Sequence, residues 1–156
     1  MELTSAAFGP GAPIPARHAM RGVPGGQNIS IPYAWSGASG SAKSYAIVLV
    51  DRSPVAHNWV HWMVVDIPPG VTELPDGASG TAAMHGAREL DNTFGSPGYG
   101  GPQPPQGTGQ HPYEATVYAL DIVELGLPQR ATLAQLEGAM AGHIVAQRSY
   151  TGVFGR

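Results

Sequence analysis

Hydrophobic and polar residues alternate along several short stretches of the chain. The two strongest, residues 43–50 and 59–67, are rich in Ile and Val and are separated by a bend at Pro54. A period of two predicts β-strands, because it places alternate side chains on one face. On this interpretation each strand has one face with a candidate polar residue. The face of the first strand consists of Tyr45, Ile47, Leu49 and Asp51, and that of the second consists of Trp59, His61, Met63 and Val65.

Weaker alternation predicts further strands over residues 28–35 and 113–121, and short extended segments at residues 1–8, 71–74 and 151–156. Residues 75–87 and 88–109 lack periodicity and are expected to be irregular. One helix is predicted, from Thr132 to about Val145, because Thr132 and Gln135 have the spacing of a capping box. Its apolar stripe at spacings of three and four consists of Leu133, Leu136, Met140 and Ile144.

Composition agrees with many short strands. The chain has 156 residues, of which 22 are Gly and 15 are Pro, and such residues supply turns and rigid loops. The length suits one domain with a sizeable core. We therefore predict a single all-β domain over residues 1–156, an antiparallel β-sandwich with helical decoration and one helix late in the chain.

Charge and the absence of Cys exclude several classes of function. The net charge is −3, and no Lys/Arg cluster indicates nucleic acid or an anionic membrane surface as a partner. There are no cysteines, so disulfides and thiolate metal sites are excluded. No apolar run approaches the ~20 residues of a transmembrane helix, and residues 1–20 lack the pattern of a secretory signal. We expect a cytoplasmic protein without membrane insertion.

Four polar side chains could form one site. Asp51 ends one strand and His61 begins the next, so the two can meet at one end of a sheet. The loop over residues 95–113 is rigid because it is rich in Pro and Gly, and it delivers His111 and Tyr113. We interpret this set as a small anion-binding pocket. The simpler alternative is that His61 is a hydrogen-bonded sheet histidine and Asp51 a turn former.

The remaining histidines are weaker candidates. His57 and His61 have the spacing of helical zinc ligands, but they are expected in a bend and a strand, where that spacing does not converge on one ion. We therefore predict no metal and no cofactor. His18 and His85 are expected to be solvated. His143 is expected near the helix end, either partly buried or facing the helix dipole.

Four fragments in this order resemble the phosphatidylethanolamine-binding protein (PEBP) family, also called Raf kinase inhibitor proteins, and most closely its bacterial YbhB/YbcL-like branch. They are VLVDRSPVAHNWVHWMVVDIP, VTELPDGAS, NTFGSPGYGGPQPPQGTGQHPYEATVYALD and GHIVAQRSYTGVFGR. The resemblance implies an antiparallel β-sandwich with a pocket at one end that accepts phosphate, phosphoethanolamine head groups or similar anions. It places Asp51, Trp59, His61, His111 and Tyr113 in that pocket, and its wall at Gly101, Pro102 and Pro104.

Two positions depart from the family pattern. The second Asp of the D-P-D-x-P motif is Ser53 here, which removes a carboxylate, and the Arg of the H-R-Y motif is Pro112, which removes a cation. A missing carboxylate makes a pocket less hostile to anions. The two changes argue against a phospholipid head group as the ligand, because both alter the charge at the pocket.

Three hypotheses follow. In the first, the protein binds a small anionic ligand through His61, His111 and Tyr113, while Asp51 orients a histidine and favours its charged form. In the second, it is an enzyme that uses Asp51, His61 and His111 for general acid/base catalysis of an isomerisation, dehydration or cyclisation. In the third, it inhibits a protease or kinase through surface loops, with a protein partner that the sequence does not identify. A homodimer is kept as one option for the oligomeric state.

Overall fold

The computed structural model describes all 156 residues and contains two antiparallel sheets and a single α-helix. The smaller sheet has the order β1-β2-β5, and the larger has the order β6-β4-β3-β7-β8. The smaller sheet consists of β1 (Glu2–Thr4), β2 (Tyr33–Ser36) and β5 (Glu73–Leu74). The larger consists of β3 (Ser44–Asp51), β4 (Trp59–Ile67), β6 (Arg88–Glu89), β7 (His111–Leu120) and β8 (Ile144–Phe154).

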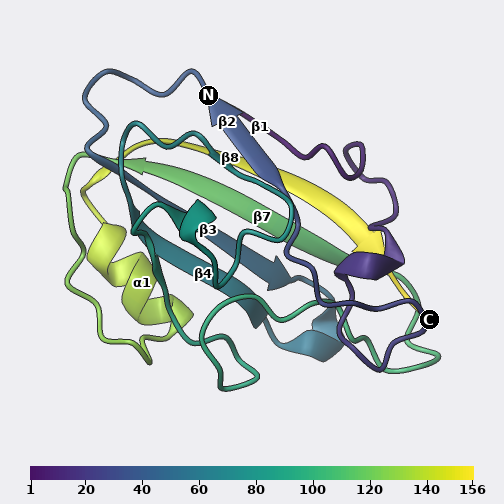
Figure 1. Ribbon diagram of the computed structural model, residues 1–156. Coiled ribbons are helices and arrows are strands. Elements are labelled where there is room, and N and C mark those ends of the chain that lie inside the picture. Colours follow the sequence, from purple (N-terminus) through teal and green to yellow (C-terminus); the bar gives the residue numbers. More distant parts are fainter.

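Three short 3-10 helices and helix α1 complete the fold. The 3-10 helices are η1 (Ala16–His18), η2 (Pro54–Ala56) and η3 (Ala82–Met84), and α1 is Leu133–Met140. Figure 1 shows α1 against one side of the large sheet, and the purple N-terminal segment beside the yellow end of β8. The prediction of an antiparallel β-sandwich with helical decoration is confirmed. No helix of the protein is both long and apolar enough to cross a membrane.

The large sheet buries both of its faces. One face packs on the smaller sheet in a cluster of 21 buried residues that includes Trp35, Ile47 and Trp62. The other face packs under α1 in a cluster of 12 that includes Val48, Met63 and Leu136. The two-sided burial explains why β3 is apolar along nearly its whole length, with all eight residues buried.

Strand β4 has the predicted bounds, but the predicted face is wrong. Leu49 pairs with Trp62 while Val50 pairs with Val60, so His61 is an extra residue in a β-bulge. A bulge shifts the alternation by one position and re-aims the extra side chain. Trp62 therefore faces the smaller sheet, and Met63 and Val65 lie in the cluster under α1.

The predicted helix is too long at its C-terminal end. The capping box of Thr132 and Gln135 is present, as predicted, but α1 ends at Met140. Gly142 has a φ of +81°, a left-handed conformation that commonly ends helices. Ile144, which we assigned to the helix, begins β8 and pairs with Leu120. The C-terminal strand is consequently 11 residues long, and α1 is not the last element of the chain.

Smaller differences concern the N-terminal half and one histidine. The strand predicted over residues 28–35 is formed only from Tyr33 onward, and the irregular residues 88–109 include β6. His18, which we expected to be solvated, is fully buried. Its Nδ1 lies 2.7 Å from the carbonyl oxygen of Ile29, which fixes the ring within the fold. His85 is exposed, as predicted.

Candidate functional site

The end of the large sheet where β3 stops and β4 and β7 begin carries the polar residues predicted as a site. Asp51 is the last residue of β3 and pairs with both Trp59 and Tyr113. These pairings bring the end of β3 together with the starts of its two neighbours. Here the structure contains a pocket of about 690 Å³. Its lining includes Asp51, Trp59, His61, Pro104, His111 and Tyr113, all of which were predicted.

Asp51 contacts His111 and not His61, the two histidines between which the sequence left its partner open. Asp51 Oδ2 lies 2.7 Å from His111 Nδ1, and Asp51 Oδ1 accepts a 2.9 Å hydrogen bond from the backbone N–H of Ser53. The side chains of Asp51 and His111 are about 5% and 1% exposed. Both carboxylate oxygens thus have partners within the protein, so Asp51 orients His111 although it also lines the pocket.

His61 is held by the Pro/Gly loop. Its Nδ1 lies 2.6 Å from the carbonyl oxygen of Gly100, and the N–H of Gly100 donates to the His61 carbonyl over 2.9 Å. Because the Gly100 carbonyl can only accept a hydrogen bond, Nδ1 must carry the ring hydrogen. Nε2 of the neutral ring then has a free lone pair. Burial lowers the pKa of His61, and its bond to the Gly100 carbonyl opposes this. His61 is therefore neutral at pH 7.

Tyr113 adds a hydroxyl without a partner. Its side chain is 1% exposed, and its OH has no partner that meets full hydrogen-bond geometry, although the Asp51 carboxylate lies near enough to act on it as an acceptor. The ring centroids of Tyr113 and His61 are 5.2 Å apart. Burial raises the pKa of Tyr113, and the nearby charge of Asp51 raises it further, so the hydroxyl keeps its proton. An unpaired buried hydroxyl is costly, which makes Tyr113 available as a donor to a ligand.

The buried neutral histidines predict a pH dependence of stability. Burial lowers the pKa of both His18 and His61, so below the ordinary value of 6.5 the unfolded chain binds more protons than the folded protein. Through these two groups the free energy of unfolding should fall as the pH drops below about 6.5. Urea unfolding between pH 8 and 5.5 measures this. The control His85→Gln, at an exposed position, should leave the slope of the free energy of unfolding against pH unchanged, and His61→Gln should reduce this slope. A slope unaffected by His61→Gln would contradict the assignment of His61 as a buried neutral histidine.

The loop that forms the pocket wall is anchored from behind by the N-terminal segment. Asn28 accepts a 2.7 Å hydrogen bond from the N–H of Gly101, and the Met20 N–H donates to the Pro102 carbonyl over 3.0 Å. A Cβ on Gly101 would overlap the carbonyl oxygen of His18. Gly101 and Pro102, which we predicted in the wall, are therefore buried against this segment and do not line the pocket. Of the three predicted wall residues only Pro104 lines it.

Sequence reasoning missed part of the lining. Residues from the η2 turn and from the loops around Phe94 and Gln103 complete the pocket, namely Val55, Ala56, His57, Thr93, Phe94, Gln103 and Pro105. Trp59 and Phe94 are 37% and 36% exposed and pack edge to face, with centroids 5.3 Å apart. The mouth is thus apolar, and the polar groups lie deeper. Among the missed residues only Phe94 has a signal in the sequence, because it is an aromatic residue in a Gly-rich loop.

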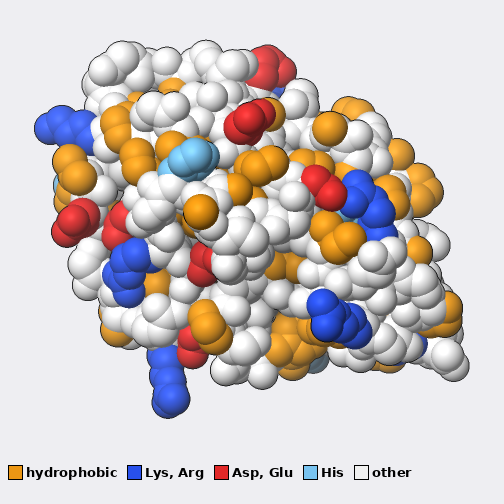
Figure 2. Space-filling view, viewed as in Figure 1, with side chains coloured by type: hydrophobic (Ala, Val, Ile, Leu, Met, Phe, Trp, Pro, Cys, Tyr) orange, Lys and Arg blue, Asp and Glu red, His pale blue; other side chains and the backbone are white.

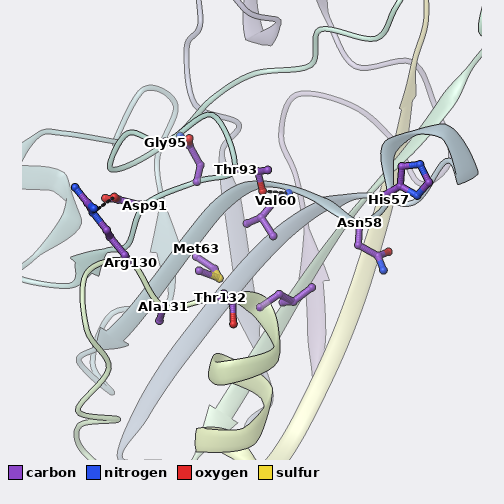
Figure 3. Close-up of a pocket in the computed structure, with 12 residues that line it drawn as sticks. His57, Asn58, Val60, Met63, Asp91, Thr93, Gly95, Arg130, Ala131 and Thr132 are labelled. Atoms are coloured by element: carbon purple, nitrogen blue, oxygen red, sulfur yellow. Dashed lines mark hydrogen bonds and ion pairs between the residues drawn. The ribbon is translucent and has the colours of Figure 1, made fainter.

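A second hollow, of about 520 Å³, lies on the α1 side of the sheet and shares His57 and Thr93 with the first pocket. Figure 3 shows Arg130 beside Asp91 at one edge, and Ala131 and Thr132 where α1 begins. Arg130 Nε and Asp91 Oδ2 are 3.9 Å apart, and the Arg130 side chain is 93% exposed. None of the lining side chains is a buried polar group without a partner. Of the two hollows, only the first therefore has a buried polar side-chain atom without a partner, the Tyr113 hydroxyl oxygen.

No group of three or more His, Asp or Glu side chains is placed to hold a metal ion. His143 lies just beyond α1 and pairs with Asp121, with 2.8 Å between Nδ1 and Oδ1.

Figure 2 shows the charged side chains of one face spread in small groups, with no broad patch of one sign. This face therefore offers no broad charged surface to a ligand.

The two-sheet fold and the polar pocket at the strand ends define a β-sandwich protein with a ligand-sized site. Residues 4–155 match the family model described as phosphatidylethanolamine-binding protein. The chain belongs to this family, as its sequence motifs indicated.

Relatives and solved structures agree with this assignment. The chain is 34% identical to a UPF0098 protein of Aquifex aeolicus, over all of this chain and 89% of the relative. It is 36% identical to LppC of Mycobacterium tuberculosis, whose name describes a candidate lipoprotein, over 99% of this chain and 72% of the relative. The structure of YbcL from Escherichia coli, described as a new member of the mammalian PEBP family, superimposes with a TM-score of 0.89 at 30% identity, covering 99% and 98% of the two chains. Cytoplasmic location stays a prediction.

Proposed function

We propose that the protein binds a small phosphate-type anion that carries one O–H group, either free phosphate or a phosphomonoester such as phosphoethanolamine. The observation that carries the proposal is the pair of unpartnered polar groups in the pocket, the Tyr113 hydroxyl and the Nε2 lone pair of His61. One is a donor and the other an acceptor. A monoprotonated phosphate offers the complementary acceptor and donor on one small tetrahedral group.

The Asp51–His111 pair supports binding of an anion in a different way from the one that the sequence suggested. We expected His111 to donate a hydrogen bond to the ligand, but both of its ring nitrogens already have protein partners, Asp51 and Thr108. His111 therefore contributes to the pocket through its ring and its contact with Asp51, and not through a free ring nitrogen. The absence of a second carboxylate at Ser53 leaves no further negative group to oppose an anion.

Comparison of phosphate with sulfate provides a sharp test. The two anions have similar size and shape, but sulfate has no O–H to donate to His61 Nε2 at neutral pH. Leaving a buried acceptor unpaired costs about 1–3 kcal/mol, so we expect sulfate to bind about ten- to a hundredfold more weakly. Isothermal titration calorimetry at pH 7 measures the affinities, and NMR signals of the His61 and His111 rings locate the ligand.

Two variants control the experiment. His61→Phe keeps an aromatic ring but lacks Nε2, and should abolish the preference for phosphate; His85→Gln, on the exposed surface, should leave it unchanged. If millimolar phosphate does not perturb the ring signals of His61 and His111 in the wild-type protein, the proposal is wrong. Equal affinities for phosphate and sulfate would show that His61 is not the acceptor.

An acid/base enzyme is the second candidate, and the free lone pair of His61 favours it. His61 Nε2 would act as the base, the protonated Tyr113 hydroxyl as the acid, and Asp51–His111 as the charge that stabilises an anionic intermediate. Proton transfer of this kind needs no cofactor. Turnover of small phosphorylated or carboxylated metabolites by the wild type but not by His61→Phe would support it, whereas equal product with both proteins would contradict it.

A further inference from the structure

Thr108, in the exposed part of the Pro/Gly loop, contacts the buried His111 from the side opposite Asp51. Its Oγ1 lies 2.8 Å from His111 Nε2 and 2.7 Å from the carbonyl oxygen of Pro105. Together with the 2.7 Å contact between Asp51 Oδ2 and His111 Nδ1, these contacts form a continuous chain from Asp51 through His111 and Thr108 to Pro105. No prediction from sequence included Thr108, and it does not line the pocket.

The positions of the hydrogens in this chain follow from the donors and acceptors. A threonine hydroxyl has one hydrogen, and a carbonyl oxygen can only accept. If the Thr108 hydrogen pointed at His111 Nε2, Oγ1 and the Pro105 oxygen would lie 2.7 Å apart with no hydrogen between them. The hydroxyl hydrogen therefore belongs to the bond with Pro105, and His111 Nε2 must carry its own hydrogen and donate it to Oγ1.

The contact with Asp51 requires a second hydrogen on or beside the same ring. Without it, the Nδ1 lone pair would face a carboxylate oxygen at 2.7 Å. The hydrogen resides on the imidazole because a carboxylic acid is ordinarily the stronger acid by about 2–3 pKa units. Asp51 Oδ1 also accepts from the Ser53 N–H, which stabilises the carboxylate form.

We propose that Thr108 is a positioning residue that keeps His111 in its doubly protonated, cationic form, so that His111 offsets the negative charge of Asp51 where the pocket receives an anion. The role assigned to the cation rests on the proposed function above; the protonation state itself does not. Thr108 acts through His111 and does not touch the ligand.

The surroundings leave His111 as the only group in this pocket able to supply a fixed positive charge. The titratable groups nearest to it are Asp51 on β3, His61 on β4 and Tyr113 on β7, and His57 lies further round the wall. His61 is neutral and Tyr113 keeps its proton. Arg156 packs against the loop from outside, where its Nε donates to the Pro104 carbonyl over 2.7 Å, and it is not part of the lining.

The test is ¹⁵N NMR of the histidine rings in the ligand-free protein, with the His111 signals assigned by His111→Gln. In the wild type at pH 7, both ring nitrogens of His111 should be protonated. Thr108→Val keeps the shape of the side chain but removes the acceptor. A hydrogen bond to a charged group contributes about 1.5–3 kcal/mol, so the valine variant should hold the Nε2 proton at least about tenfold less strongly and change to the neutral ring. Thr108→Ser retains the oxygen and should behave as wild type.

Phosphate affinity is the second readout. Thr108→Val should weaken phosphate binding about tenfold at pH 7.5, and Thr108→Ser should not. A neutral His111 in the wild type at pH 7 would overturn the inference, as would full protonation retained in Thr108→Val. The wild-type measurement decides even if the valine variant does not fold. A doubly protonated His111 in a protein that does not bind phosphate would refute the proposed function and leave the protonation state established.

Discussion

Replacing Asp51 with Ala should lower the free energy of unfolding by about 3–5 kcal/mol, the usual cost of removing one partner from a buried ion pair. The Asp51 side chain is about 5% exposed and accepts from both His111 and the Ser53 N–H. Alanine leaves both donors buried without acceptors. Because domains of this size are stable by only about 5–15 kcal/mol, the loss is a large fraction of the total.

Asp51→Ala should also abolish phosphate binding, since His111 then loses the carboxylate that favours its charged form. Asp51→Asn should destabilise the fold less, because its amide oxygen can still accept one hydrogen bond, but it should lose binding as well. Urea unfolding followed by circular dichroism and calorimetric titration measure the two effects. Asp121→Asn is the matched control, since Asp121 pairs with His143 on the surface and such pairs contribute about 0–1 kcal/mol. A change within 1 kcal/mol for Asp51→Ala would contradict this account.

Replacing Gly101 with Ala is expected to have the second-largest effect, a destabilisation of about 3 kcal/mol, at the upper end of what overpacking costs. The added Cβ would overlap the His18 carbonyl and lie 2.7 Å from the Ala19 carbonyl carbon. Both are backbone atoms and cannot rotate away. The loop would have to separate from the N-terminal segment, so the Asn28 contact and the position of Pro104 in the pocket wall should be disturbed together.

Gly138→Ala is the control for this substitution, because it adds the same methyl group at a position in α1 with no atom within 4 Å. Higher helix propensity should make that variant more stable by up to about 1 kcal/mol. Thermal or urea unfolding of both variants, with phosphate titration of Gly101→Ala, completes the comparison. If Gly101→Ala is as stable as the wild type, the loop does not pack tightly against residues 18–20.

The family assignment changes what the pocket residues imply. The resemblance placed two histidines, an aspartate and a tyrosine in one pocket, and the structure brings all four together. The four residues do not contribute in the same way. Both ring nitrogens of His111 have partners, Asp51 and Thr108, whereas His61 and Tyr113 each have a free group that faces the ligand space. This arrangement supports our proposal of a ligand that both accepts and donates a hydrogen bond.

Local sequence determined the elements whose stability comes from local geometry. The bounds of β4 agree with its apolar period, and the capping box of α1 was readable from Thr132 and Gln135 because its bonds span three residues. The Pro and Gly content of residues 95–113 was sufficient to predict a rigid loop. The motifs identified the family, and the family pattern placed six of the residues that line the pocket.

Tertiary contacts decided the rest. The bulge at His61 depends on how β4 pairs with β3, and a single added residue reverses every face that a period of two predicts. The end of α1 was set by Gly142 and by the pairing of Ile144 with Leu120, 24 positions earlier in the chain. Asp51 pairs with His111 rather than His61 because β3 lies between β4 and β7 and offers both neighbours. Thr108 acquires its role only because a loop without periodicity folds back onto His111, a contact that hydrogen-bond geometry reveals and residue spacing does not.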